Sequence, residues 1–104
     1  MTENELQLEV QALCAELGLL WHHCKDSRKC AGHPGFPDLV ILGPGGLHIV
    51  ELKSDHGDTS AEQDQWIWLL HQSSFTEGQV WRPADLKSGR IRGTLERLAR
   101  PCEF

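Results

Sequence analysis

The sequence predicts a single α/β domain over residues 1–104, in which helices flank a mixed central sheet. Apolar residues recur at helical spacing in three segments, and the shorter apolar runs between them have the length and flanking turn residues of strands. The predicted order is helix, strand, strand, strand, helix, strand, helix. A chain of 104 residues is also near the commonest size of one domain.

The first helix is predicted over residues 4–17, where leucine and valine residues recur at helical spacing. Gly18 is typical of the position that follows the last turn of a helix. Residues 19–24 then predict a short strand, and the polar residues 25–35, rich in glycine and proline, predict a loop.

Two further strands, over residues 37–42 and 47–53, are predicted to form a hairpin. Pro44 and Gly45 lie midway between them and fit the central positions of a type II turn. Most two-residue hairpins use primed turns instead, so this placement of the turn is a hypothesis about the register.

That register places three charged side chains together at the open end of the hairpin. Asp38 falls directly opposite Glu51, and Lys53 projects from the same face of its strand. Two carboxylates directly across a strand pair repel each other and call for a counter-charge, which a hard divalent cation such as Mg²⁺ supplies. The alternative is a turn aspartate beside a solvated strand end.

The second helix is predicted over residues 60–72, with Thr59 or Ser60 as its N-cap. Trp66 and Trp68 are two residues apart and cannot both face the core, so we expect Trp68 to be exposed.

Residues 78–82 predict the last strand, and residues 83–100 predict turns followed by a helix that ends before Pro101. We expect Trp21 and Trp81, which lie in strands, to be buried in the core.

The charge is unevenly distributed, although the net charge is −5. Residues 1–81 carry twelve acidic and four basic side chains, whereas residues 82–104 carry six basic and three acidic ones. This asymmetry permits a surface that faces phosphates, and the alternative is an ordinary solvated helix face.

The sequence contains neither a signal-peptide pattern nor an apolar run of the roughly 20 residues that a membrane-spanning helix requires. We therefore expect no membrane contact and a cytoplasmic location, where cysteines stay reduced as free thiols.

With these residues in view, the chain resembles the small stand-alone phage and bacterial members of the VRR-NUC family of PD-(D/E)XK nucleases. The resemblance covers roughly residues 3–86 and implies a restriction-endonuclease-like core. The matching segments, in chain order, are ELQ (5–7), DSR (26–28), GFPDLVIL (35–42), VELK (50–53), SAEQDQW (60–66) and WRPADL (81–86).

The resemblance implies a metal-dependent DNA endonuclease whose Mg²⁺ or Mn²⁺ ion is held by Asp38, Glu51 and the backbone carbonyl of Leu52. It implies that Glu5 completes the acidic cluster from the first helix. Glu9, one helical turn further along the same face, is the alternative to Glu5.

The resemblance also assigns the remaining site residues. Lys53 would assist the attacking water, and Gln63 would line the site from the second helix. Gln63 is equally well placed to form a capping box with Ser60. The predicted DNA-binding residues are Lys25, Arg28, Lys29 and Arg82.

The expected partner is duplex or branched DNA, such as a four-way junction, and a homodimer would suit the two-fold symmetry of a junction. The alternative function is a DNA-binding module of the same fold that does not cut and is stabilised by zinc. Thiolate and imidazole ligands for zinc are available in a short segment that contains His22, His23, Cys24, Cys30 and His33.

Overall fold

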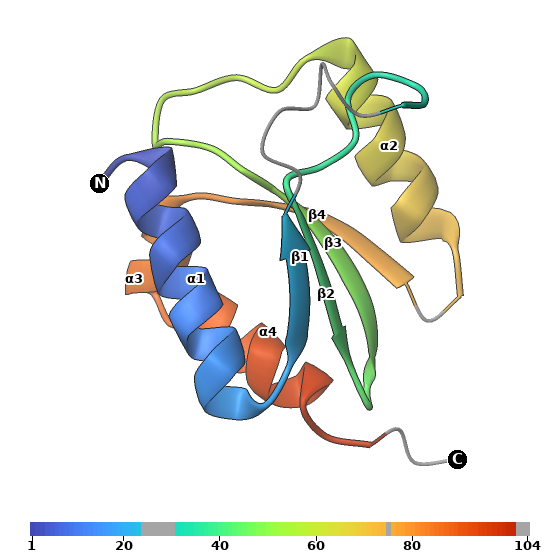
Figure 1. Cartoon of the computed structure of the whole chain (residues 1–104). Coiled ribbons are helices and arrows are strands. Elements are labelled where there is room, and N and C mark those ends of the chain that lie inside the picture. Colours follow the sequence, from blue (N-terminus) through green and yellow to red (C-terminus); the bar gives the residue numbers. More distant parts are fainter. Residues whose placement is uncertain (24–30, 75, 102–104) are drawn as a thin grey trace.

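The computed structural model of the protein describes residues 1–23, 31–74 and 76–101. Its elements in chain order are α1 (Glu3–Leu17), β1 (Leu20–His23), β2 (Leu39–Gly43), β3 (Gly46–Leu52), α2 (Ala61–Gln72), β4 (Thr76–Trp81), α3 (Pro83–Lys87) and α4 (Arg90–Leu98). The α/β fold class and the predicted element order are confirmed, with one addition at the C-terminal end (Figure 1).

The addition is α3, which occupies part of the segment that the sequence predicted as turns. Pro83 stands at the start of this short helix, a position that suits proline because no hydrogen bond from its nitrogen is needed there. Gly89 then adopts a left-handed conformation, with φ 85°, and separates α3 from α4.

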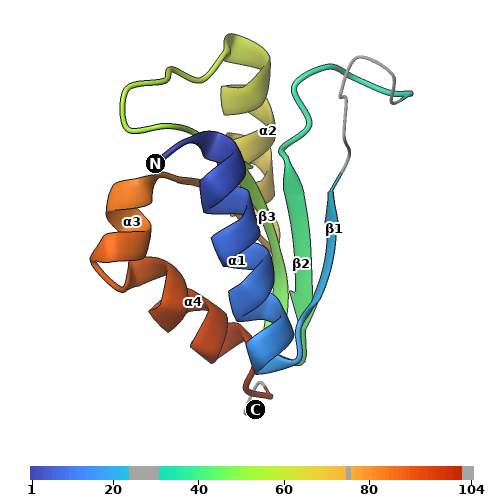
Figure 2. The same cartoon turned by 60° about the vertical axis from the view of Figure 1, so that its left-hand side comes forward.

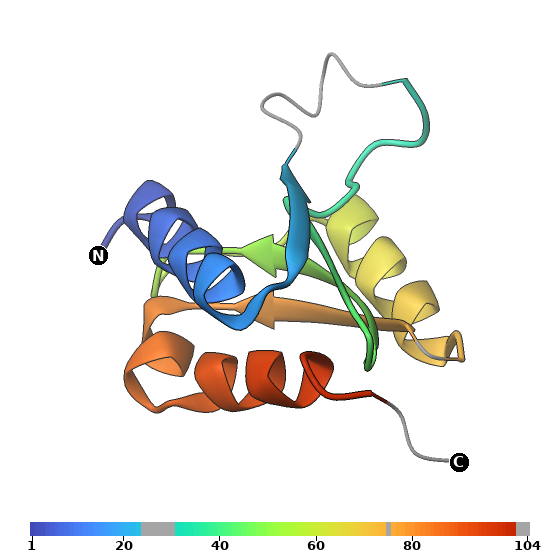
Figure 3. The same cartoon turned by 60° about the horizontal axis from the view of Figure 1, so that its bottom comes forward.

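The four strands form one mixed sheet in the order β1-β2-β3-β4. The first three strands are antiparallel, and β4 runs parallel to β3 after the crossover through α2. Helices α1, α3 and α4 form one layer beside the sheet (Figure 2), while α2 lies on the opposite side and packs mainly on β4 and β3 (Figure 3).

The core lies between the sheet and the layer of α1, α3 and α4. It includes Leu6, Val10, Leu39, Ile41, Val50, Leu52, Trp81, Ile91, Leu95 and Leu98. Alternation along β2 and β3 turns the other set of side chains, including Val40, Ile49 and Glu51, toward the side of α2.

The predicted hairpin register is confirmed, because Gly43 pairs with Gly46 and Leu39 pairs with Val50. The predicted type II turn is wrong, because the positive φ of 138° lies at Gly46 and not at Gly45. The turn instead packs against the end of α4, where the Gly45 amide donates a hydrogen bond of 2.8 Å to the Leu98 carbonyl.

The expectations for the tryptophans are met in three of four positions. Trp81 is fully buried and Trp68 is 64% exposed. Trp66 is partly buried, and its indole donates to the Pro34 carbonyl over 3.0 Å. The expectation for Trp21 is wrong: it is 44% exposed because β1 is an edge strand with a neighbour on one side only.

Within the part of the chain that the structure describes, no helix is both long and apolar enough to cross a lipid bilayer.

Candidate active site

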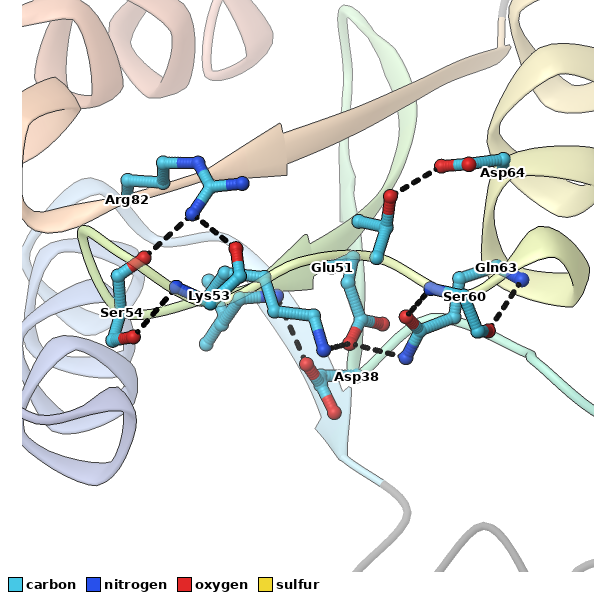
Figure 4. Close-up of polar contacts among 11 residues, drawn as sticks. Asp38, Glu51, Lys53, Ser54, Ser60, Gln63, Asp64 and Arg82 are labelled. Carbon is cyan, nitrogen blue, oxygen red and sulfur yellow. Dashed lines mark hydrogen bonds and ion pairs between the residues drawn. The ribbon is translucent and has the colours of Figure 1, made fainter.

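The candidate active site lies where the β2–β3 hairpin opens, beside the first turn of α2 (Figure 4). Asp38 immediately precedes β2, and its Oδ2 accepts a hydrogen bond of 2.9 Å from the Leu52 amide at the end of β3. This bond continues the hairpin beyond its last paired residues and holds the Asp38 carboxylate across from Glu51.

Glu51 is the buried acidic residue at the centre of the site, with only 3% of its surface exposed. Its Oε1 accepts a hydrogen bond of 2.9 Å from Nε2 of Gln63 and lies 3.8 Å from Nζ of Lys53. Its Oε2 is buried and has no hydrogen-bond donor among the described residues. Burial and the nearby negative charge of Asp38 raise the pKa of the Glu51 carboxyl to about 8.

Gln63 reaches Glu51 from the start of α2, and its other polar atoms hold it in place. Its Oε1 accepts from the Ser60 amide over 2.8 Å, and its own amide donates to Oγ of Ser60 over 3.2 Å. These two bonds form a capping box, which leaves Nε2 to bind Glu51. The two predicted roles of Gln63, lining the site and capping the helix, therefore occur together.

Lys53 follows β3 directly, and its backbone amide donates a hydrogen bond of 3.0 Å to the Trp81 carbonyl at the end of β4. Its side chain is mostly buried and extends toward Glu51. The structure thus brings together four of the predicted site residues: Asp38, Glu51, Lys53 and Gln63.

The two carboxylates fit a divalent cation. Oε2 of Glu51 is a buried oxygen without a partner among the described residues, and a carboxyl group with a raised pKa beside a second carboxylate is a site that a positive charge would stabilise. Mg²⁺ commonly uses one or two protein carboxylates and fills its remaining positions with waters and substrate phosphate. In the described residues, no cluster of three or more Asp, Glu, His or Cys side chains could hold a metal ion, so the pair has no third carboxylate beside it.

Glu5 does not join this pair. Its carboxylate is exposed and accepts a hydrogen bond of 3.1 Å from the Thr2 amide, while the Glu5 amide donates to Oγ1 of Thr2. These bonds form the capping box of α1 and lower the pKa of the Glu5 carboxyl. The sequence already indicated this role of Glu5, because Thr2 and Glu5 have the spacing of a capping box.

The acidic residue of α1 that acts electrostatically on the site is Glu3, whose negative charge contributes to the raised pKa of Glu51. Sequence reasoning did not select Glu3. Nothing in its local pattern distinguishes it from other acidic residues in the first turn of a helix.

Arg82, predicted to bind DNA, has its guanidinium turned toward the protein backbone. One terminal nitrogen, Nη1, donates to the carbonyls of Ser54 and Gly57, each over 2.6 Å. The other predicted DNA-binding residues, Lys25, Arg28 and Lys29, lie outside the described residues.

Two of the proposed zinc ligands, Cys24 and Cys30, also lie outside the described residues. His22 and His23 lie on the edge strand β1, and His33 is exposed in the loop that leads to β2. The zinc hypothesis therefore remains a prediction.

Comparison with known proteins supports the architecture. No family model matches the sequence. A segment of 36 residues, 35% of the chain, is 44% identical to part of the "Probable kinase PglW" of Streptomyces coelicolor, and the match spans 2% of that protein. A solved structure described as a "VRR_NUC domain protein" superposes with a TM-score of 0.64 at 19% sequence identity, covering 98% of both chains. The chain therefore has the fold of a VRR-NUC domain, as its sequence motifs predicted.

Proposed function

We propose that the protein is a divalent-metal-dependent DNA endonuclease of the VRR-NUC family. The observation that carries this proposal is the buried carboxyl group of Glu51, which has one oxygen without a partner in the described part of the chain and stands beside Asp38, Lys53 and Gln63. A buried carboxyl group that has a raised pKa and specific charged neighbours is typical of a functional site. Its burial costs stability unless a ligand compensates for the lost contact with water.

The metal would be held by Asp38, Glu51 and the carbonyl of Leu52. A bound Mg²⁺ or Mn²⁺ supplies charge stabilisation at a phosphate oxygen and a water of lowered pKa. The protein contributes orientation. The Leu52 amide holds Oδ2 of Asp38, and Gln63 holds Oε1 of Glu51, so that each carboxylate keeps its other oxygen for a ligand.

Lys53 supplies the positive charge of the site. With Nζ 3.8 Å from Oε1 of Glu51, its ammonium is placed to orient the attacking water or to stabilise the negative charge that develops on the phosphate. In-line attack by water would then leave a 5′-phosphate, as the resemblance to the family implies.

We propose branched DNA as the preferred substrate and a homodimer as the active form. The support for a dimer is an uncovered part of the sheet on the side of α2. Leu20 and Leu42 are paired across β1 and β2 there, and they are 70% and 47% exposed. Exposed apolar pairs of this kind are typical of surfaces that bind another chain. A two-fold dimer would present two identical sites to a junction.

We propose the cytoplasm as the place of action. The support is the free, buried thiol of Cys14, which is typical of a reducing compartment.

The test is cleavage of labelled linear duplex, single strand, flap and four-way junction in Mg²⁺, Mn²⁺ or EDTA. We expect metal-dependent cutting that disappears in Asp38→Ala and persists in Glu96→Ala, a matched loss of one exposed acid on α4. If folded protein binds DNA without cutting any substrate, the non-cutting binding module replaces the nuclease, and a zinc titration becomes the next experiment.

A further inference from the structure

The segment that links β3 to α2 is held in place by residues at the end of β4 and directly after it. This segment, the Ser54–Gly57 loop, begins directly after Lys53. Nη1 of Arg82 donates to the carbonyls of both Ser54 and Gly57, each over 2.6 Å, and so joins the two ends of the loop (Figure 4).

The neighbours of Arg82 bind the same loop. The Ala84 amide donates to Oδ1 of Asp55 over 3.3 Å, and the Trp81 carbonyl accepts from the Lys53 amide over 3.0 Å. Residues 81–84 thus contact the chain at Lys53, at Asp55 and at both ends of the Ser54–Gly57 loop. These contacts give a structural role to the WRPADL segment, which the metal site itself does not use.

The loop in turn lies close to the side chain of Lys53. A Cβ built on Gly57 would lie 3.6 Å from Cδ of Lys53 and 3.1 Å from Oγ of Ser54. The Gly57 amide also donates to Oγ of Ser54 over 3.0 Å, which closes the loop on itself. A shift of the Gly57 backbone would therefore change the space that holds the stem of Lys53.

The backbone of Arg82 is also held, through contacts with α3 and α4. Its amide donates to Oδ2 of Asp85 over 2.9 Å, and Oδ1 of Asp85 pairs with Arg90 at 2.9 Å. A guanidinium presents several N–H groups in a rigid plane and can bind two carbonyls at once, whereas a lysine ammonium acts as a flexible point charge.

We propose that Arg82 is a positioning residue, which holds the Ser54–Gly57 loop and through it places Lys53 against Glu51. This inference rests on the proposed nuclease function, and it differs from the DNA-binding role that the sequence predicted for Arg82. A phosphate contact and a positioning contact affect different measured quantities, so the two roles can be separated.

The experiment compares Arg82→Ala and Arg82→Lys with Arg92→Ala, which removes the same charge from an exposed ion pair with Glu16. Three quantities are measured on a four-way junction with Mg²⁺: kcat, KM, and the dissociation constant over a range of salt concentrations. We expect kcat to fall roughly 10- to 100-fold in both Arg82 variants, since small misplacements of a catalytic group have effects of that size. We expect the dissociation constant and its salt dependence to match those of Arg92→Ala.

A second readout needs neither DNA nor metal. Amide hydrogen exchange at Gly57 and Ala84 should become faster in the Arg82 variants and stay at the wild-type rate in Arg92→Ala. If Arg82→Ala fails to fold, Asp55→Ala removes only the contact with the Ala84 amide and should change kcat and exchange in the same direction.

The inference is overturned if kcat is unchanged while binding weakens and the salt slope falls by about one unit, the result for a phosphate contact. Unchanged exchange at Gly57 and Ala84 also overturns it. Wild-type protein that cuts no DNA would overturn the proposed nuclease instead, and the exchange rates would still decide whether Arg82 holds the loop.

Discussion

Replacing Glu51 by glutamine removes the titrating carboxyl group of the site while keeping the shape of its side chain. The Gln63 amide can still donate to the side-chain carbonyl oxygen that would replace Oε1. In the wild-type protein without metal, burial and the charge of Asp38 raise the pKa of the Glu51 carboxyl from 4.5 to about 8. The variant has no group that titrates at this position.

The direction in which the free energy of unfolding changes with pH follows from proton binding. Between pH 4.5 and about 8 the folded wild-type protein retains a proton on Glu51 that the unfolded chain has lost. The folded state therefore binds more protons, and the free energy of unfolding falls as the pH rises through this range. At about 1.4 kcal/mol for each pKa unit, the wild-type protein would lose at most on the order of 5 kcal/mol relative to Glu51→Gln.

The assay is urea unfolding of both proteins in EDTA at pH 5, 7 and 9. Other titrating groups are the same in both proteins, so the difference between the two stability curves isolates Glu51. We expect the variant to gain stability relative to wild type as the pH rises, whereas Glu96→Gln should run parallel to wild type. Added Mn²⁺ at pH 8 should stabilise wild type and leave Glu51→Gln unaffected. Parallel curves for wild type and Glu51→Gln from pH 5 to 9 would refute the reasoning.

Three further predictions concern the other parts of the site and the proposed dimer. Lys53→Ala should reduce cleavage roughly 100-fold or more with DNA affinity nearly unchanged, and a parallel loss of affinity in a binding assay would contradict its catalytic role. Gln63→Ala should destabilise the protein by about 1 kcal/mol through loss of the cap and should also lower the cleavage rate. The control Gln65→Ala, an exposed neighbour on α2, should change neither the melting temperature nor the cleavage rate. The double change of Leu20 and Leu42 to serine should shift sedimentation from dimer to monomer, and an unchanged sedimentation coefficient would place the dimer contact elsewhere. Leu8→Ser is the matched control, an exposed leucine on α1.

The sequence by itself determined the helices and strands other than α3, and it determined the pairing of β2 with β3. Alternation along the two strands and the Pro44-Gly45 turn fix the register, and the register alone places Asp38 across from Glu51. The capping pattern likewise fixed the start of α2, and with it the place of Gln63. These features depend on residues close together in the chain, where periodicity and turn geometry are decisive.

Only the tertiary structure decided which charged side chains of the helices and of distant loops reach the site and which do not. It placed Glu3 of α1 where its charge acts on Glu51, and it turned Arg82 toward the Ser54–Gly57 loop, whose first residue lies 28 positions earlier in the chain. It also left Trp21 exposed at the sheet edge. Each outcome depends on how helices and loops pack against the sheet, and residue spacing carries little information about contacts between segments so far apart in the chain.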